Sequence, residues 1–86
     1  MSDIQRFHVA TRYSEIAIHN GTVYLAGQVA DDATEDIRGQ TRQVLAAIDR
    51  LLAEAGSDKS RLLSAQIFLA DLADYDGLNA VWDAWV

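Results

Sequence analysis

The chain has 86 residues, half of them hydrophobic, and a formal net charge of −6 at pH 7. A chain of this length forms one domain with a modest core, and its acidity disfavours general binding to nucleic-acid phosphates. It contains no cysteine, which excludes a disulfide or a thiol nucleophile in this sequence.

The N-terminal third predicts antiparallel strands joined by a tight turn. Apolar residues alternate over 14–19 and again over 22–26, and the intervening Asn20-Gly21 tolerates the positive φ angles of a two-residue hairpin. A shorter extended piece, residues 4–9, is expected to pair at the edge. Gly27 closes the second strand, where a bulge or a close backbone approach is expected.

Residues 34–55 are expected to form a long helix with one buried face. Asp32 is the predicted cap, with Glu35 in capping-box spacing, and Gly56 is the expected residue just beyond the C-terminus. The buried face contains residues that recur at three- and four-residue steps: Ile37, Thr41, Val44, Leu45, Ile48, Leu51, Leu52 and Ala55.

The last quarter predicts a strand followed by a second helix. Both alternating faces of residues 62–69 carry apolar side chains, so this strand is predicted to be central and covered on both sides. Asp74 is the expected cap of the helix. The apolar side of that helix contains Tyr75, Leu78, Val81, Trp82 and Trp85.

The predicted fold class is therefore α+β, a two-layer sandwich in which two helices cover one face of a mixed β-sheet. Nothing in the sequence covers the other face, so a partner subunit is expected there, near Tyr24, Gln66 and Phe68. No apolar run approaches the ~20 residues of a membrane helix, and residues 1–6 lack a signal-peptide pattern. A cytoplasmic protein is expected.

Four segments in this order are similar to the RidA/YjgF family. They are Gly27-Gln28-Val29 after an apolar strand, the helix start 36–43, the stretch 68–71, and Asn79-Ala80-Val81-Trp82. Residues 18–20 and 82–86 are similar to the YoaB-like branch of this family. The resemblance runs from about Tyr13 to Val86. It implies a chorismate-mutase-like fold and a homotrimer with clefts between subunits. It also implies hydrolysis of reactive enamine and imine intermediates, with no metal and no cofactor.

The same resemblance implies two further strands beyond Val86, one with a substrate-binding arginine and one with a carboxylate. The domain, residues 1–86, is accordingly expected to be truncated at its C-terminus. The best-known family members also have a serine where this chain has Ala26.

Tyr13 and Asn79 match the site tyrosine and asparagine of the family and are the expected catalytic residues. A phenol can hydrogen-bond a substrate or position a water, and an amide can orient the substrate amine. The alternatives are an ordinary half-buried aromatic at a strand start and an exposed helical asparagine. Ala26, Gly27 and Gln28 are the expected substrate-binding residues, because a backbone beside glycine allows close approach. A plain β-bulge is the alternative.

The other candidate site residues are expected to have structural roles. His8 and His19 are eleven positions apart, without the spacing of a metal site or a triad. Trp82 and Trp85 are expected to pack against the core or a subunit rather than stack on bases. Strand alternation directs Arg12 away from Tyr13, so it is expected to be solvated.

Three functions follow from these observations. The first is hydrolysis of enamine and imine carboxylates to 2-oxo acids and ammonia. The second is a trimeric small-molecule-binding protein without turnover, which Ala26 favours because it offers no hydroxyl. The third is a ribonuclease, which the net charge disfavours.

Overall fold

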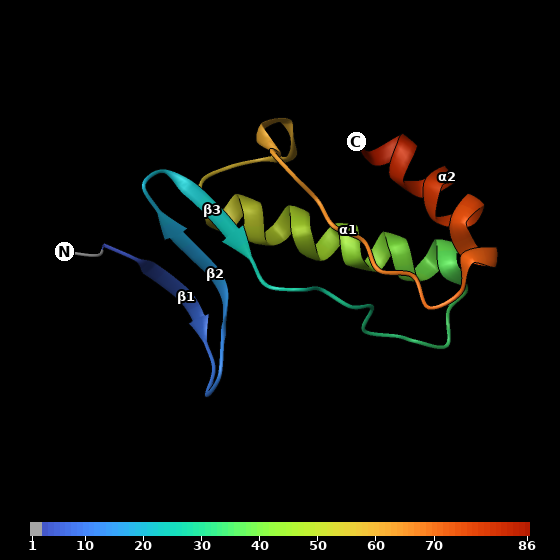
Figure 1. The fold of residues 1–86 in the computed structure, drawn as a ribbon, viewed down its shortest axis with the longest axis horizontal. Coiled ribbons are helices and arrows are strands. Elements are labelled where there is room, and N and C mark those ends of the chain that lie inside the picture. The colour runs from blue at the N-terminus through green and yellow to red at the C-terminus, as the bar shows by residue number, and fades with distance from the viewer. Residues whose placement is uncertain (1–2) are drawn as a thin grey trace.

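Three antiparallel strands form a sheet in the computed structural model, which describes residues 3–86 (Figure 1). They are β1 (Gln5–Val9), β2 (Ser14–His19) and β3 (Thr22–Leu25), in the spatial order β1-β2-β3. The predicted edge strand is confirmed as β1, which pairs with β2. Met1 and Ser2, part of the stretch inspected for a signal peptide, lie outside the described residues.

The predicted Asn20-Gly21 hairpin is confirmed. The φ angles are 51° at Asn20 and 78° at Gly21, and His19 pairs with Thr22 across the turn. Two positive φ angles are typical of a type I′ turn, whose twist matches that of the flanking strands. The turn therefore sets the register of the β2–β3 pair.

One face of the sheet packs toward the first helix. Ile16 pairs with Leu25, and Ile18 pairs with Val23, so these four side chains share a face. Ile16 is fully buried. The opposite face carries Tyr24, whose side chain is 60% exposed, as expected for a surface that nothing covers.

The first helix, α1, spans Ile37–Glu54 and begins later than predicted. The predicted cap at Asp32 is wrong, because its carboxylate accepts hydrogen bonds from the backbone N–H and the hydroxyl of Thr34. Asp36 is the cap. Its backbone is extended (φ −68°, ψ 177°) and its carboxylate accepts the Gly39 N–H at 2.8 Å. A local Asx turn thus competes with helix initiation and delays it.

The C-terminus of α1 is confirmed at Gly56, which has a φ of 80°. The Gly56 N–H donates to the Ala53 carbonyl at 3.0 Å, and the Ser57 N–H donates to the Leu52 carbonyl at 2.8 Å. This pair of bonds is a Schellman motif, which satisfies the last carbonyls of the helix. The predicted buried face is also confirmed, since Leu45, Leu51 and Leu52 are buried.

Residues 62–69 do not form the predicted strand. Within the described chain, the backbone groups of residues 63–69 make no backbone–backbone hydrogen bond. Leu63 and Phe68 are each 87% exposed, so the predicted coverage on both sides is also wrong. A strand needs a hydrogen-bonded neighbour, and a trough separates this segment from the edge of β3. The segment follows a 3₁₀ turn, Lys59–Arg61.

The second helix, α2, spans Tyr75–Trp85 after a 3₁₀ turn, Leu72–Asp74. Asp74 occupies the cap position but its side chain makes no capping bond, because its backbone is already helical. Asp71 caps the 3₁₀ turn instead, accepting the Ala73 N–H at 2.9 Å. The helix packs on α1 through buried Leu78.

The α+β class is confirmed. Within residues 3–86 the sheet is antiparallel rather than mixed, since the segment 62–69 is unpaired. No helix in this range is both long and apolar enough for a bilayer crossing. The radius of gyration is 14.1 Å, whereas a compact chain of this length has roughly 12 Å. The molecule is therefore more open than a closed domain.

Candidate functional site

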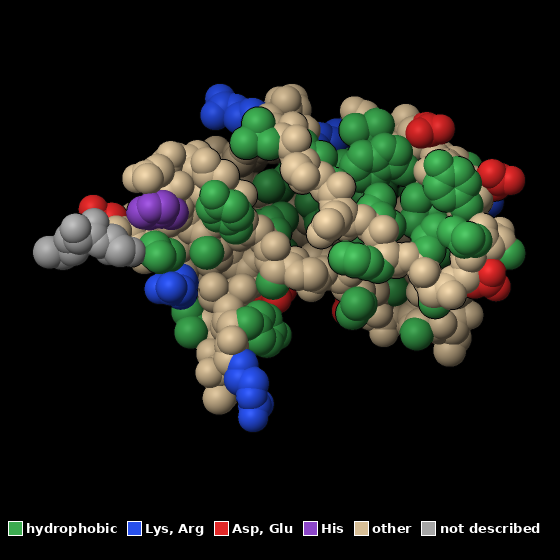
Figure 2. Space-filling model, in the orientation of Figure 1, with side chains coloured by type: hydrophobic (Ala, Val, Ile, Leu, Met, Phe, Trp, Pro, Cys, Tyr) green, Lys and Arg blue, Asp and Glu red, His purple; other side chains and the backbone are tan. Residues whose placement is uncertain are grey.

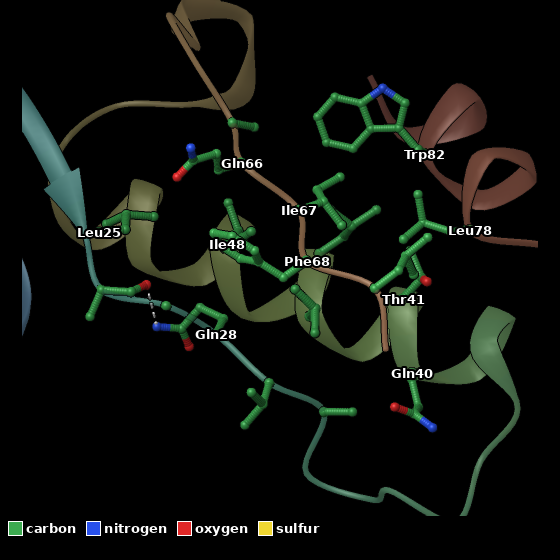
Figure 3. Close-up of a pocket in the computed structure, with 18 of the residues that line it drawn as sticks. Leu25, Gln28, Gln40, Thr41, Ile48, Gln66, Ile67, Phe68, Leu78 and Trp82 are labelled. Atoms are coloured by element: carbon green, nitrogen blue, oxygen red, sulfur yellow. Dashed lines mark hydrogen bonds between the residues drawn. The ribbon is translucent and has the colours of Figure 1, made fainter. Parts of the chain in front are cut away.

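A trough with a volume of about 770 Å³ lies over α1, between β3 and the segment 62–69 (Figure 3). One wall is formed by β3 and the loop that follows it, residues 23–30. The other wall is formed by residues 64–69, and Leu78 and Trp82 of α2 contribute to the lining. The floor is the buried face of α1. Most of the lining is apolar, with Ile37, Val44, Leu45, Ile48 and Leu52 on the floor.

The three expected substrate-binding residues, Ala26, Gly27 and Gln28, lie together on the first wall. The Gln28 amide nitrogen donates to the Ala26 carbonyl at 3.1 Å, which Figure 3 shows, and to the Glu15 carboxylate at 3.2 Å. Since the Ala26 N–H donates to the Glu15 carbonyl at 3.0 Å, the wall is tied to β2. The loop after β3 is thereby held in one position.

The two expected catalytic residues lie apart. Tyr13 is 58% exposed in the connection between β1 and β2, where its carbonyl accepts the Ala10 N–H at 2.7 Å. Asn79 is half-buried on α2. Figure 1 places this connection and α2 on opposite sides of a molecule that measures 46 × 29 × 19 Å. Neither residue lines the trough, so one chain does not bring them together.

Sequence reasoning missed two polar residues on the trough floor, Gln40 and Thr41, as parts of a site. Thr41 was assigned only to the buried helix face, and its hydroxyl donates to the Ile37 carbonyl at 2.7 Å. The Gln40 amide donates to the carbonyls of Ala33 at 3.3 Å and Glu35 at 2.8 Å. Both side chains therefore donate hydrogen bonds to backbone carbonyls. The signal for Thr41 was a polar residue within the predicted apolar face of the helix, whereas Gln40 lies outside that face.

The electrostatics of the trough are neutral. Among residues 3–86, its lining contains no arginine, lysine, aspartate or glutamate, so these residues offer no cation for a carboxylate. In the same range, the two carboxyl groups with a lowered pKa lie elsewhere. The Thr34 hydroxyl lowers the pKa of Asp32, and the Ser60 hydroxyl lowers the pKa of Asp58, with each serine or threonine backbone N–H adding to the effect.

His8 has a structural position at the edge of the sheet. His8 of β1 has a φ of 55°, and its Nε2 lies 2.5 Å from Oε2 of Glu54, at the end of α1. This contact ties the edge strand to the helix. Within residues 3–86, no three histidine or carboxylate side chains gather closely enough to hold a metal ion.

The family model described as Endoribonuclease L-PSP matches residues 3–86. The chain belongs to this family. The predicted RidA/YjgF membership and the YoaB-like resemblance are therefore confirmed. The RutC family protein YoaB of Escherichia coli is 45% identical over 83 residues, which cover 96% of this chain and 72% of that protein.

Two further relatives extend the comparison. The crystal structure of an uncharacterized protein from Pseudomonas aeruginosa has a TM-score of 0.93 and 56% identity, covering 95% of this chain and 71% of that chain. The protein named Reactive Intermediate Deaminase A, chloroplastic, of Arabidopsis thaliana is 32% identical over 76 residues, covering 81% of this chain and 41% of that protein. Both relatives are longer than the region that aligns with this chain.

Proposed function

We propose that this L-PSP family chain works in the cytoplasm as part of a homotrimeric enzyme that hydrolyses enamine and imine carboxylates to 2-oxo acids and ammonia. The observation that carries the proposal is its 32% identity to the Arabidopsis protein named as a reactive intermediate deaminase. The expected site residues of that family are present here as Tyr13, Gln28 and Asn79.

The reaction requires the protein mainly to position the water and the substrate. Water adds to the imine carbon, the resulting carbinolamine collapses, and ammonia leaves as the 2-oxo acid forms. The imine is already electrophilic, so fixing water and substrate in a near-attack arrangement supplies the rate enhancement. Tyr13 and Asn79 would orient the water and the amine, and the backbone beside Gly27 would contact the substrate.

A site between subunits accounts for the separation of Tyr13 from Asn79 within one chain. The exposed Tyr24 and Phe68 offer apolar area for such an assembly. Figure 2 shows hydrophobic side chains gathered over α2 and the neighbouring segment 62–72. Apolar surface of this kind typically marks an interaction site rather than a solvated face.

Ammonia release tests the proposal. The imine of pyruvate is generated in situ by an amino-acid oxidase, and free ammonia is followed in time with and without the protein. Acceleration over buffer is expected. The assay is run on the 86-residue chain and on the Pseudomonas aeruginosa relative, because the described residues that line the trough include no cation to hold the substrate carboxylate. If neither protein exceeds the buffer rate, the deaminase proposal is wrong.

A second candidate is a trimeric small-molecule-binding protein without turnover. Ala26 favours it, because a methyl group stands on the trough wall where the best-known family members have a serine hydroxyl. Calorimetry with 2-oxobutanoate separates the two functions. Saturable binding without faster ammonia release supports the binding protein. The nuclease named in the family description is disfavoured by the net charge of −6.

A further inference from the structure

We propose that Glu15 is a positioning residue for the candidate site, because it orients the side-chain amide of Gln28 so that only the amide oxygen is free to contact a ligand. The site then selects a ligand with an N–H on the reacting carbon, as in an imine or enamine, over a 2-oxo acid, which only accepts. The identity of that ligand rests on the proposed function, whereas the orientation of the amide does not.

Glu15 lies on the outer face of β2, beside the end of β3. The neighbouring Ile16 is fully buried toward α1, so strand alternation directs Glu15 to the opposite face. Since the Ala26 N–H donates to the Glu15 carbonyl at 3.0 Å, Glu15 stands next to the point where the chain leaves β3 and continues to Gln28.

The Glu15 carboxylate has an unusual environment for an acidic side chain. Glu15 is half-buried, and within residues 3–86 no lysine or arginine pairs with its carboxylate. The side-chain hydrogen bond that it does accept comes from the Gln28 amide. Partial burial of a carboxylate without a cation costs free energy, so a simple tie between strand and loop would be made more cheaply by a neutral side chain.

Both hydrogens of the Gln28 amide nitrogen are used in these contacts. Nε2 lies 3.2 Å from Oε2 of Glu15 and 3.1 Å from the carbonyl oxygen of Ala26, the second of which Figure 3 shows. Both partners are acceptors, so the reversed amide would place its oxygen against two other oxygens. The nitrogen is therefore held toward the sheet, and the amide has one permitted orientation.

The amide oxygen of Gln28 keeps both of its lone pairs. Gln28 lines the trough, and within residues 3–86 no group donates a hydrogen bond to its Oε1. Figure 3 shows this oxygen directed away from the Ala26 carbonyl. Because linked hydrogen bonds polarise one another, the negative charge behind the nitrogen makes the oxygen a stronger acceptor.

An oxygen acceptor distinguishes the substrate of the proposed reaction from its product. An imine or enamine has an N–H at the position where the 2-oxo acid has a carbonyl oxygen, whose lone pairs would face those of Oε1. A site built to hydrogen-bond an N–H rejects an analogue that lacks it, because a polar group of the site is then left without a partner. The charge of Glu15 also favours a ligand nitrogen that is positively charged.

A purely structural role for Glu15 makes a different prediction. Loss of a tie between β2 and the loop would weaken all ligands alike, whereas loss of the amide orientation would change their ranking. Glu15→Gln keeps the size of the side chain, but its own amide can donate to Gln28 Oε1 and so permits the reversed orientation. The matched control is Gln43→Ala, because Gln43 ties the far end of the same loop by accepting the Asp32 N–H at 2.9 Å.

Calorimetry compares 2-hydroxybutanoate with 2-oxobutanoate, which have the same charge and differ in the hydrogen-bond donor at C2. For the 86-residue chain we expect the hydroxy acid to bind at least about tenfold more tightly. In Glu15→Gln this ratio should fall toward one, through weaker binding of the hydroxy acid and tighter binding of the oxo acid. In Gln43→Ala both affinities should change together. By NMR, the Gln28 side-chain amide hydrogens should exchange faster in Glu15→Ala than in the unmodified chain.

Equal affinities for the two acids, binding of neither acid, or an unchanged ratio in Glu15→Gln would overturn the proposal. A ratio that falls as far in Gln43→Ala would also overturn it, since Glu15 would then act only as a tie. Ammonia release by the same proteins separates this inference from the proposed function. The expected ratio without hydrolysis contradicts the deaminase proposal alone, whereas hydrolysis without selectivity contradicts the role of Glu15 alone.

Discussion

Trp85 at the end of α2 donates its indole N–H to the carboxylate of Asp49 in the middle of α1, with an Nε1–Oδ2 distance of 2.9 Å. Lys59 Nζ lies 5.0 Å from the centroid of a Trp85 ring, and the Trp82 and Trp85 centroids are 5.4 Å apart. Trp85 therefore contributes to the packing of α2 on α1, as expected for packing against the core. This hydrogen bond joins the end of α2 to α1.

Replacing Trp85 by Phe removes this hydrogen bond while keeping most of the aromatic contact. The expected loss is about 1 kcal/mol in the free energy of unfolding, because Asp49 is exposed and regains water. Urea unfolding of Trp85→Phe, Asp49→Ala and the double variant measures it. A coupling of zero between the two positions would show that the hydrogen bond contributes nothing.

Gly77 is required by the close approach of α2 to α1. A Cβ placed there lies 2.5 Å from Cγ2 of Ile37, so Gly77→Ala is expected to cost about 1–3 kcal/mol in spite of the better helix propensity of alanine. The cost should shrink in an Ile37→Ala background. Ala84→Gly, at an exposed position of the same helix, measures the propensity contribution alone. Stabilisation by Gly77→Ala would contradict the close approach.

Asp36 rather than Asp32 caps α1. Asp36→Ala is expected to lower the free energy of unfolding by about 1 kcal/mol, because it leaves the Gly39 N–H without its partner. Asp36→Ser should retain most of the stability. Asp32→Ala is the matched control and should affect the exchange of the Thr34 amide without affecting that of Gly39. Faster exchange of the Gly39 amide in Asp32→Ala, with no effect of Asp36→Ala, would instead support Asp32 as the cap.

The carboxyl groups of Asp32 and Asp58 make the free energy of unfolding depend on pH. Their folded-state pKa values lie below the ordinary value of 3.8, so their stabilisation is present above about pH 4 and is lost as the pH falls through the folded-state pKa. Thr34→Ala is expected to raise the pKa of Asp32, and Ser60→Ala that of Asp58. Carboxyl chemical shifts between pH 2 and about 7 measure both. An unchanged Asp32 titration in Thr34→Ala would contradict the hydroxyl as its main cause.

Tyr13 and Asn79 are expected to act from different subunits. Tyr13→Phe and Asn79→Ala should each lower kcat/KM for ammonia release by about 10²-fold, whereas Tyr24→Phe should have no effect. When the two inactive variants are mixed and reassembled, about a quarter of the clefts receive both native residues, so activity should return. A mixture as inactive as its components would place both residues in the same subunit or outside the site.

Local features were predictable from the sequence because neighbouring residues determine them. Asn20 and Gly21 accept the positive φ angles of their turn without tertiary help, and Gly56 ends α1 by the same property. The buried face of α1 follows from its period. The start of α1 was harder, because Asp32 and Asp36 both precede the helix. The Asp32 carboxylate accepts from Thr34, and only the Asp36 carboxylate reaches the Gly39 N–H of the helix.

The sequence by itself determined the α+β class, the hairpin and the helix faces, since local conformational preferences and apolar periodicity encode them. It also indicated the family, through the resemblance of four ordered segments. Only the tertiary structure decided that residues 62–69 are unpaired and that the β1–β2 connection, which contains Tyr13, lies apart from α2, which contains Asn79. A strand exists only where another backbone satisfies its hydrogen bonds, and a site exists only where distant segments meet. Both conditions depend on contacts between residues far apart in the chain, which alternation and spacing do not specify.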